Sequence, residues 1–388
     1  MTTISAFFRE QAASLGSRLI EMRRELHMHP ELSNEEHDTT ARIRSWLTEA
    51  GIRMLDLKLP TGVLAEIKGT HPGPTIMLRA DIDALPVNEE TGLPFASTVP
   101  GKMHACGHDF HTASMIGAAK LLQEHAGELH GTVRILFQPA EELAVGARAV
   151  IEAGALEGVA AVFGMHNKPE LPVGTVGIRT GPLMASVDRF EIEVFGKGGH
   201  AGMPDTTIDP VVVSSAIVGA LQTLVSRNAS PQHAAVVSVC KLQAGSTWNV
   251  IPDTGVLEGT VRTFQREARE KIPGQMKRVV ESVAAGYGAE ARLKWTSMLP
   301  AVNNDARMAE IMHSAAAAQG LQIVEAAPSM GGEDFALYQE RLPGCFIWMG
   351  TGGTEQWHHP KFTLNEDALS ISAALFAEAA VQALKSVG

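Results

Sequence analysis

Apolar and polar positions follow two different periods in the first part of the chain. A helical period covers residues 15–52 and is interrupted at Pro30, with Ser33 and Glu36 spaced as a capping box for a second helix. Short apolar runs typical of buried strands come next, at 62–69, 75–86 and 131–142. A helical stretch at 111–125 lies between the last two of them. Strands that alternate with helices predict an α/β domain with a central, mostly parallel sheet.

The pattern changes near residue 187. Strand-like alternation at 188–196 is followed by a helix, two strands, a second helix interrupted early by Pro273, and a last strand: 209–228, 234–245, 254–264, 266–288 and 289–297. This β-α-β-β-α-β order is typical of a ferredoxin-like unit and is long enough to form its own domain.

The α/β pattern resumes after residue 297, with a helix at 303–321, a strand at 345–352 and a helix from about 366. We therefore expect a catalytic domain built from residues 1–186 and 298–388, with a smaller domain, 187–297, inserted in it.

Composition adds limits to this picture. With 388 residues, 45% hydrophobic and 19% charged, the chain is expected to fold as a globular protein of two domains. A net charge of -11 without a basic tract argues against nucleic acid or an anionic membrane as the main partner. No run reaches about 18 apolar residues, and the N-terminus lacks the features of a signal peptide, so a cytoplasmic location is expected.

Three widely spaced cysteines do not indicate a disulfide framework. Cys240 and Cys345 lie in strand-like segments, where packing in the core is the simplest explanation. Cys106 differs, because it lies in "HACGHDFH" with His108, Asp109 and His111. It could be a nucleophile, half of a redox pair, a buried filler or a metal ligand.

Five groups of potential metal ligands lie beside predicted turns or strand ends. They are Asp81 and Asp83 in "RADIDALP"; Cys106, His108, Asp109 and His111; Glu141 and Glu142 in "PAEE"; His166 in "GMHN"; and His358 and His359 in "QWHHPKF". Each group alone is weak evidence. The two glutamates follow an apolar strand, where one could ligate a metal while the other acts as a base toward water.

This distribution favours one interpretation of Cys106. A nucleophile would leave the glutamates, His166 and His358 without a role, and a redox pair lacks a second nearby cysteine. A metal-bound thiolate uses all the groups together and favours an ion such as zinc over magnesium or calcium.

The segment "GKGGHA" matches a loose dinucleotide-binding pattern and follows a predicted strand. However, no helix follows it immediately, and no acidic residue lies about 20 positions further on. Nucleotide binding is therefore not expected.

Ten ordered motifs together resemble the M20 metallopeptidase family, and more narrowly its amidohydrolase branch of hippurate hydrolases, N-acyl-amino-acid deacylases and indoleacetyl-amino-acid hydrolases. They cover nearly the whole chain: "LHMHPELSNEE", "ADIDALP", "HACGHDFH", "FQPAEE", "GMHN", "GGHAGMPD", "NVIP", "GTVRTF", "GGEDF" and "HHPKFTLNED".

The resemblance implies a site for two divalent metal ions, with zinc expected and manganese, cobalt or nickel as alternatives. It assigns five ligands, Cys106 between the ions together with His108, Glu142, His166 and His358. It makes Glu141 the general base and Asp83 a support for a ligating group. His359 is the alternative to His358, which is preferred because of its spacing from Phe362.

The resemblance also implies that the inserted domain is a lid that forms a homodimer or tetramer. His200 would reach a substrate carbonyl, often in the partner's active site, while Asn249, Arg262 and Gly331 would contact the substrate. The expected reaction is hydrolysis of an N-acyl amino acid at its amide bond. A dipeptidase or exopeptidase that uses the same metals is the alternative, and a non-catalytic metal-binding protein is less favoured because it would not need Glu141.

Overall fold

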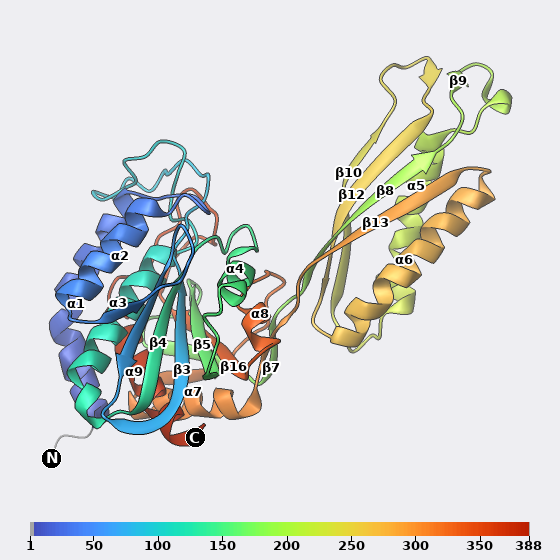
Figure 1. Cartoon of the computed structure of the whole chain (residues 1–388). Helices are drawn as coiled ribbons and strands as arrows, with labels where there is room; N and C mark the ends of the chain where they lie inside the picture. Colours follow the sequence, from blue (N-terminus) through green and yellow to red (C-terminus); the bar gives the residue numbers. More distant parts are fainter. Residues whose placement is uncertain (1–3, 388) are drawn as a thin grey trace. The chain divides into compact units, whose positions relative to one another are not determined.

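The computed structural model describes residues 4–387, which divide into two compact units. Within these residues, unit 1 comprises 4–183, 303–327 and 334–387, and unit 2 comprises 184–302 and 328–333. The helices and strands of both appear in Figure 1. Unit 2 therefore includes a short segment, 328–333, from the last part of the chain.

Unit 1 is built on an eight-stranded mixed sheet in the order β1-β2-β4-β3-β5-β16-β6-β15. The strands are β1 (Arg53–Leu55), β2 (Val63–Lys68), β3 (His71–Asp81), β4 (His130–Gln138), β5 (Val159–Lys168), β6 (Thr175–Ile178), β15 (Gln322–Glu325) and β16 (Gly344–Gly350). Neighbours from β4 to β16 are parallel, whereas the pairs β1-β2, β2-β4 and β16-β6 are antiparallel. The outer pair β6-β15 is parallel as well, so four of the seven neighbouring pairs are parallel, and the predicted mostly parallel sheet is observed as a mixed sheet with a parallel majority.

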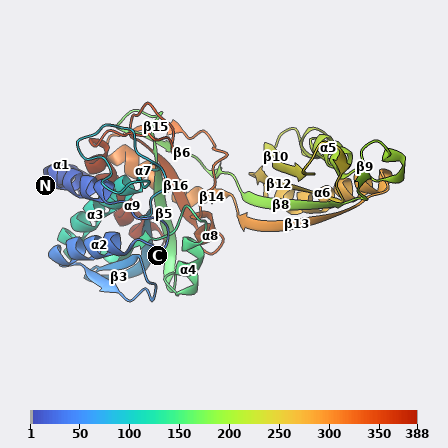
Figure 2. The ribbon, with the colours of Figure 1, turned by 90° about the horizontal axis from the view of Figure 1, so that it is seen from above.

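Helices pack on this sheet, with α3 and α9 on one side and α4 and α8 on the other (Figures 1 and 2). The helices of unit 1 are α1 (Ile4–Met28), α2 (His37–Glu49), α3 (His108–Glu124), α4 (Gly146–Glu152), α7 (Ala306–Ala318), α8 (Ala336–Gln339) and α9 (Ala368–Ser386), with a 3-10 turn η1 (Ala126–Glu128). Gly117 of α3 allows close packing, because a Cβ there would lie 2.8 Å from Ala373 of α9.

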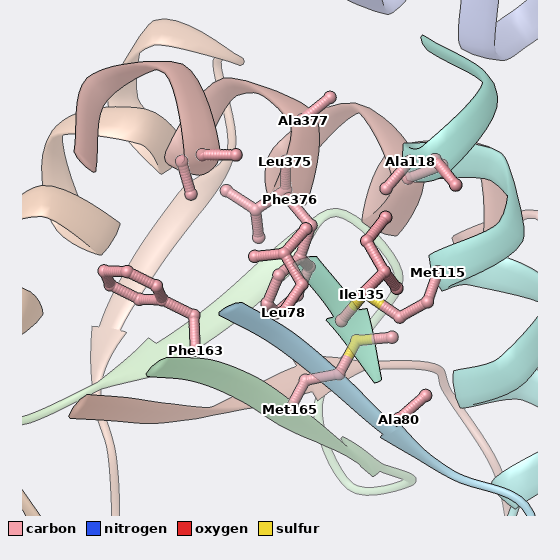
Figure 3. Close-up of a cluster of buried hydrophobic side chains, with 14 of the residues drawn as sticks. Leu78, Ala80, Met115, Ala118, Ile135, Phe163, Met165, Leu375, Phe376 and Ala377 are labelled. Carbon is pink, nitrogen blue, oxygen red and sulfur yellow. The ribbon is translucent and has the colours of Figure 1, made fainter. Parts of the chain in front are cut away.

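The core of unit 1 lies between the sheet and the helices α3 and α9. Figure 3 shows side chains from β3, β4 and β5 meeting those of the two helices, among them Leu78, Ile135, Phe163, Met115 and Phe376. All five are fully buried. Because apolar burial contributes roughly 25 cal/mol per Å², this layer fixes the sheet and with it the strand ends that carry polar residues.

Unit 2 has a four-stranded antiparallel sheet in the order β10-β12-β8-β13. Its main elements in chain order are β8 (Val187–Phe195), α5 (Pro210–Leu221), β10 (Ala235–Ala244), β12 (Thr254–Thr263), α6 (Arg266–Gly286) and β13 (Glu290–Leu299). Shorter elements are β9 (Gly199–His200), β11 (Val250–Ile251), the 3-10 turn η2 (Pro204–Thr206) and the π turn η3 (Leu224–Asn228). Two further strands, β7 (Gly181–Met184) and β14 (Val302–Asn304), pair with each other.

Three local predictions are wrong, and the first two concern Pro273 and Cys240. Pro273 lies inside α6 without ending it, because Ile272, Met276 and Val280 form a buried stripe that holds the helix. Cys240 is exposed, because β10 has a register shift between Val239 and Lys241 that leaves it without a paired residue.

Ser33 and Glu36 form no capping box. Glu36 is the residue before α2, but its side chain makes no capping bond, and Ser33 donates a hydrogen bond to Asp83 instead. Both side chains serve the region described in the next subsection. The buried position expected for Cys345 is confirmed.

Two segments among the described residues have the length and apolar composition of a membrane span, Pro210–Asn228 and Ala368–Ser386. In the second, 78% of the apolar window is buried, and α9 is part of the core in Figure 3. In the first, Val213, Ile217 and Leu221 pack in the core of unit 2. Packing within the protein accounts for the apolar character of α9, whereas only 33% of the apolar window in the first segment is buried, and Val211 and Val212 there are exposed.

Candidate metal centre

The turn after β4 carries Glu141 and Glu142. Ala140 and Ala144, which flank the pair, have left-handed backbone conformations with φ of 53° and 57°. Such a conformation costs a non-glycine residue about 1–3 kcal/mol, so neighbouring groups must hold it. The buried Glu36 does so, since its carboxylate accepts a hydrogen bond of 2.8 Å from the Ala140 N–H. Burial raises the pKa of Glu36.

A second turn places Cys106 and His108 at the start of α3. Gly107 between them has φ of 84°, and a Cβ at this position would clash with the side chain of Asn167. The Asn167 amide occupies that space and donates a hydrogen bond of 2.6 Å to the Cys106 carbonyl oxygen. Glycine is therefore required here both for the backbone conformation and for the close approach of Asn167.

Asp83 determines which nitrogen of His108 carries a proton. His108 Nδ1 lies 2.9 Å from the Asp83 carbonyl oxygen and 3.2 Å from its carboxylate, and both are acceptors, so Nδ1 donates. The other nitrogen, Nε2, is buried, and no described residue hydrogen-bonds to it. Asp83 also accepts hydrogen bonds from Ser33 and from the Glu142 N–H at 3.0 Å. It thus orients both turns.

Burial by itself would lower the pKa of His108, but the carboxylates of Asp81, Asp83 and Glu142 raise it to about 10. The region around Nε2 is thus strongly attractive to a positive charge. Glu142 Oε1 lies 3.8 Å from this nitrogen and likewise has no hydrogen-bond partner among the described residues. Buried polar atoms without partners are rare, and a bound cation would satisfy both.

Cys106 and His166 form the opposite side of the cluster. Cys106 Sγ lies 3.3 Å from His166 Nε2, and His166 Nδ1 donates to the Asn167 carbonyl oxygen at 2.9 Å, which leaves the Nε2 lone pair directed at the sulfur. Burial, followed by the charges of Glu142 and Glu141, raises the pKa of the Cys106 thiol well above its usual value. Only a nearby cation would reverse this and stabilise a thiolate.

His358 completes the cluster. Its ring Nε2 lies 3.5 Å from Glu142 Oε1, and its backbone N–H donates to the Ala105 carbonyl oxygen at 2.8 Å. His359 does not belong to the cluster, because its Nδ1 accepts a hydrogen bond from the Lys361 N–H. The structure therefore brings His358 into the cluster and leaves His359 outside it.

The potential ligand atoms gather in overlapping groups, each within 4.8 Å. They are Cys106, His108 and His166; Cys106, Glu142 and His358; and His108, Glu141 and Glu142. Sulfur, imidazole and carboxylate donors together suit zinc or a related transition metal. The orphaned His108 Nε2 and Glu142 Oε1 point to the same conclusion, so the residues present fit a metal ion.

Another group of the same kind contains Asp81, His108 and His111. His111 donates from Nδ1 to Asp81 at 2.6 Å and accepts the Asn167 N–H at Nε2 at 2.9 Å. Because both nitrogens are occupied, His111 supports the centre and does not offer a ligand atom. Its neutral form is favoured, since burial lowers its pKa.

Arg79 and Asp334 belong to a buried network that the sequence did not indicate. Arg79 is paired with Asp81 at 2.6 Å and with Asp334 at 2.8 Å, and all three side chains are fully buried. The Asp334 N–H lies 3.4 Å from Glu141 Oε1. Glu36 and Asn167 were also not assigned to the site from the sequence. Of the two, only Asn167 had a sequence signal for such a role, because it directly follows the candidate ligand His166.

The remaining predicted residues, His200, Asn249, Arg262 and Gly331, lie in unit 2. His200 is exposed on β9, and its Nδ1 accepts a hydrogen bond of 2.9 Å from the Gly202 N–H. In its neutral form the proton is therefore on Nε2. Asn249 lies close by, since its carbonyl oxygen accepts the Ala201 N–H at 3.2 Å. Arg262, on β12, is half-buried.

The chain matches the Peptidase family M20/M25/M40 over residues 77–382 and belongs to this family. The crystal structure of a Bacillus subtilis dinuclear metal binding peptidase from the M20 family is similar, with a TM-score of 0.89 and 57% identity, covering 96% of this chain and 99% of that one.

Two curated relatives refine the family assignment. N-acetylcysteine deacetylase of Bacillus subtilis is 60% identical over 372 residues, which is 96% of this chain and 98% of that protein. An IAA-amino acid hydrolase of Arabidopsis thaliana is 42% identical over 377 residues, with 95% and 85% of the two chains covered. The chain thus belongs to the amidohydrolase branch of the family, as its motifs predicted.

Proposed function

We propose that this protein is a metal-dependent amidohydrolase that cleaves the amide bond of N-acyl amino acids. The observation that supports this most is the cluster of Cys106, His108, Glu142, His166 and His358, with Glu141 beside it. Family membership and the relatives named for deacetylation and amino acid conjugate hydrolysis support the same reaction.

In this proposal the five residues of the cluster would hold two divalent ions, and Cys106, which belongs to two of the ligand groups, would contribute to both ions. Zinc is expected from the donor set, and manganese, cobalt or nickel are alternatives. Bound there, the ions would polarise the amide carbonyl and make water acidic enough to react near neutral pH.

Glu141 is assigned the proton transfers. Its carboxylate takes a proton from the attacking water and then delivers it to the nitrogen of the leaving amino acid. With metal bound, Asp83 would keep the proton of His108 on Nδ1, so that Nε2 gives up its own proton and ligates the ion. The two adjacent glutamates thus have separate tasks, one as a ligand and one as a base.

The predicted domain of residues 187–297, which lies within unit 2, is proposed to act as a ferredoxin-like lid. The Nε2–H of His200 would donate to the developing oxyanion, and Asn249 would contact the substrate carbonyl. The planar guanidinium of Arg262 suits the substrate carboxylate, and Gly331 would line the same region. The catalytic domain, which carries Glu141 and the proposed metal ligands, remains assigned to residues 1–186 and 298–388.

A substrate panel tests the proposed reaction. Metal-stripped protein, reconstituted separately with Zn²⁺, Mn²⁺, Co²⁺ or Ni²⁺, should hydrolyse N-acetyl and N-benzoyl amino acids faster than free dipeptides. N-acetylcysteine belongs in the panel because one of the relatives is an N-acetylcysteine deacetylase. Faster cleavage of dipeptides would favour the dipeptidase alternative. Analogues with an amidated carboxylate should react more slowly, because they lose the charge-assisted contact with Arg262.

We also propose that the protein is located in the cytoplasm. We further propose that it is a homodimer or tetramer assembled through unit 2. Unit 2 exposes several large apolar side chains near His200 and Asn249 in sequence: Met203, Leu242, Trp248 and Val250. Trp248 is 91% exposed, and burial of such an indole against a second copy would be favourable.

Co-expression of His200→Ala and Glu141→Gln chains, each with its own tag, tests whether His200 acts in the partner's site. In a twofold dimer, random pairing makes about half of the dimers mixed, and each mixed dimer regains one of its two sites, so the activity of the whole mixture should recover to roughly a quarter of the wild-type value. Each variant alone should be nearly inactive. A mixture as inactive as the single variants would show that His200 does not act across the dimer.

A further inference from the structure

Lys168 and two tryptophans form a compact group at the carboxyl end of β5. The Lys168 ammonium lies 4.6 Å from the centre of the Trp357 ring and 5.5 Å from that of Trp348. The two indole rings are 5.8 Å apart, and Trp357 also packs on His166 with ring centres 4.4 Å apart. Trp357 thus lies between a cation and a proposed metal ligand.

Polar contacts fix the position of Trp357. Its Nε1–H donates to the carbonyl and side-chain oxygens of Asn167, both at 3.2 Å. Glu170 links the same segments, because it pairs with Lys168 at 2.9 Å and accepts a hydrogen bond of 2.8 Å from Gln356, the residue before Trp357. The segment around Trp357 is therefore attached to the end of β5 by stacking, charge and hydrogen bonds.

His358, the next residue, needs such support. Its φ of 67° is unusual for a residue with a side chain, so the surrounding structure must hold it. Its side chain is 55% exposed and so receives little packing of its own, in contrast to the buried His108 and His166. The hydrogen bond to Ala105 fixes only its backbone nitrogen. Trp357 is the neighbouring group that could hold the rest.

We propose that Trp357 is a positioning residue that holds His358 in its strained conformation. The inference rests on the proposed function, since it assumes that His358 ligates metal. It assigns to Trp357 and Lys168 a role in the affinity for the ion on the His358 side. Groups that orient metal ligands commonly affect metal affinity or activity by about 10–100-fold.

Metal titration of Trp357→Ala tests the proposal without relying on activity. Calorimetry with Zn²⁺ should show two ions bound by the wild-type chain. In the variant, affinity for one of them should be about 10–100-fold weaker, while the other changes little. Reconstitution with Co²⁺ gives a second measurement, because absorption from the Cys106 thiolate should persist as the second equivalent of cobalt binds more weakly.

Two further variants separate the contributions of the group. Trp357→Phe keeps a ring between Lys168 and His166 but loses the N–H bond to Asn167, so its loss of affinity should be smaller. Lys168→Met keeps most of the packing and removes the charge, and should weaken the same ion. Trp295→Ala, in β13 of unit 2, is the matched control and should bind both ions normally.

The outcomes distinguish this inference from the proposed function. A wild-type chain that binds no metal would contradict the proposed function itself. A wild-type chain with two ions, together with unchanged affinities in both Trp357 variants, would overturn only the role of Trp357. Equal weakening of both ions would also overturn it, because a general loss of structure would then explain the result. Trp357→Phe keeps the test decisive if the alanine variant fails to fold.

Discussion

Glu141→Gln should lower kcat by about 10²–10⁴-fold while the protein keeps its metal, because an amide has the shape of the carboxylate but cannot accept the proton of water. Glutamine can keep the contact with the Asp334 N–H, which lies 3.4 Å from Glu141 Oε1. Steady-state kinetics together with metal analysis of the same preparation measures both effects. Full turnover in a metal-loaded Glu141→Gln protein would make the assignment of the base wrong.

Glu142→Gln is the matched control for this experiment. Its change is chemically identical and lies one residue away, but Glu142 Oε1 faces His108 Nε2 at 3.8 Å and His358 Nε2 at 3.5 Å. A neutral amide there is a much weaker ligand, so this variant should lose metal as well as activity. If both variants kept metal equally well, Glu142 would not be a ligand.

Cys106→Ser should weaken metal binding more than about 100-fold and lower activity with it, because a hydroxyl is a harder donor than a thiolate and does not ionise near neutral pH. Cys106 is fixed from both sides, by the Asn167 amide on its carbonyl oxygen and by His166 Nε2 3.3 Å from its sulfur. The serine variant should therefore change the donor atom and little else. Equilibrium dialysis against Zn²⁺ measures the loss.

Cys240→Ser is the control, because this exposed cysteine lies on β10 of unit 2 and should bind metal as the wild type does. A Cys106→Ser protein that retained its ions but lost activity would instead support a nucleophilic cysteine. This result would favour a nucleophilic role for Cys106, which is one of the roles that the motif "HACGHDFH" by itself allows.

Much of the candidate site could be located from the sequence because its residues lie in short motifs beside strand ends. Glu141 and Glu142 follow the apolar strand β4, and Cys106 and His108 flank a glycine just before α3. Such positions are set by local chemistry: where the strand ends, where a helix begins, and where a left-handed turn is needed. The choice of His358 over His359 rested on spacing, and the geometry of the cluster favours it.

The errors arose where long-range contacts override local preference. Glu36 has the spacing of a capping residue, yet its carboxylate is used by the Ala140 N–H, 104 residues away in the chain. Pro273 normally ends a helix, but packing of α6 outweighs its cost. Cys240 has the apolar neighbours of a core strand, but a register shift in β10 leaves it exposed.

By itself, the sequence determined the classes of element, the family and the residues with metal-binding chemistry, because these depend on residue type and short spacing. Only the tertiary structure decided how those residues support one another. His111 donates from Nδ1 to Asp81 and accepts the Asn167 N–H at Nε2, and Asp83 holds the Nδ1 proton of His108. A side chain's tautomer, charge and orientation depend on partners brought close by folding, and no local pattern specifies them.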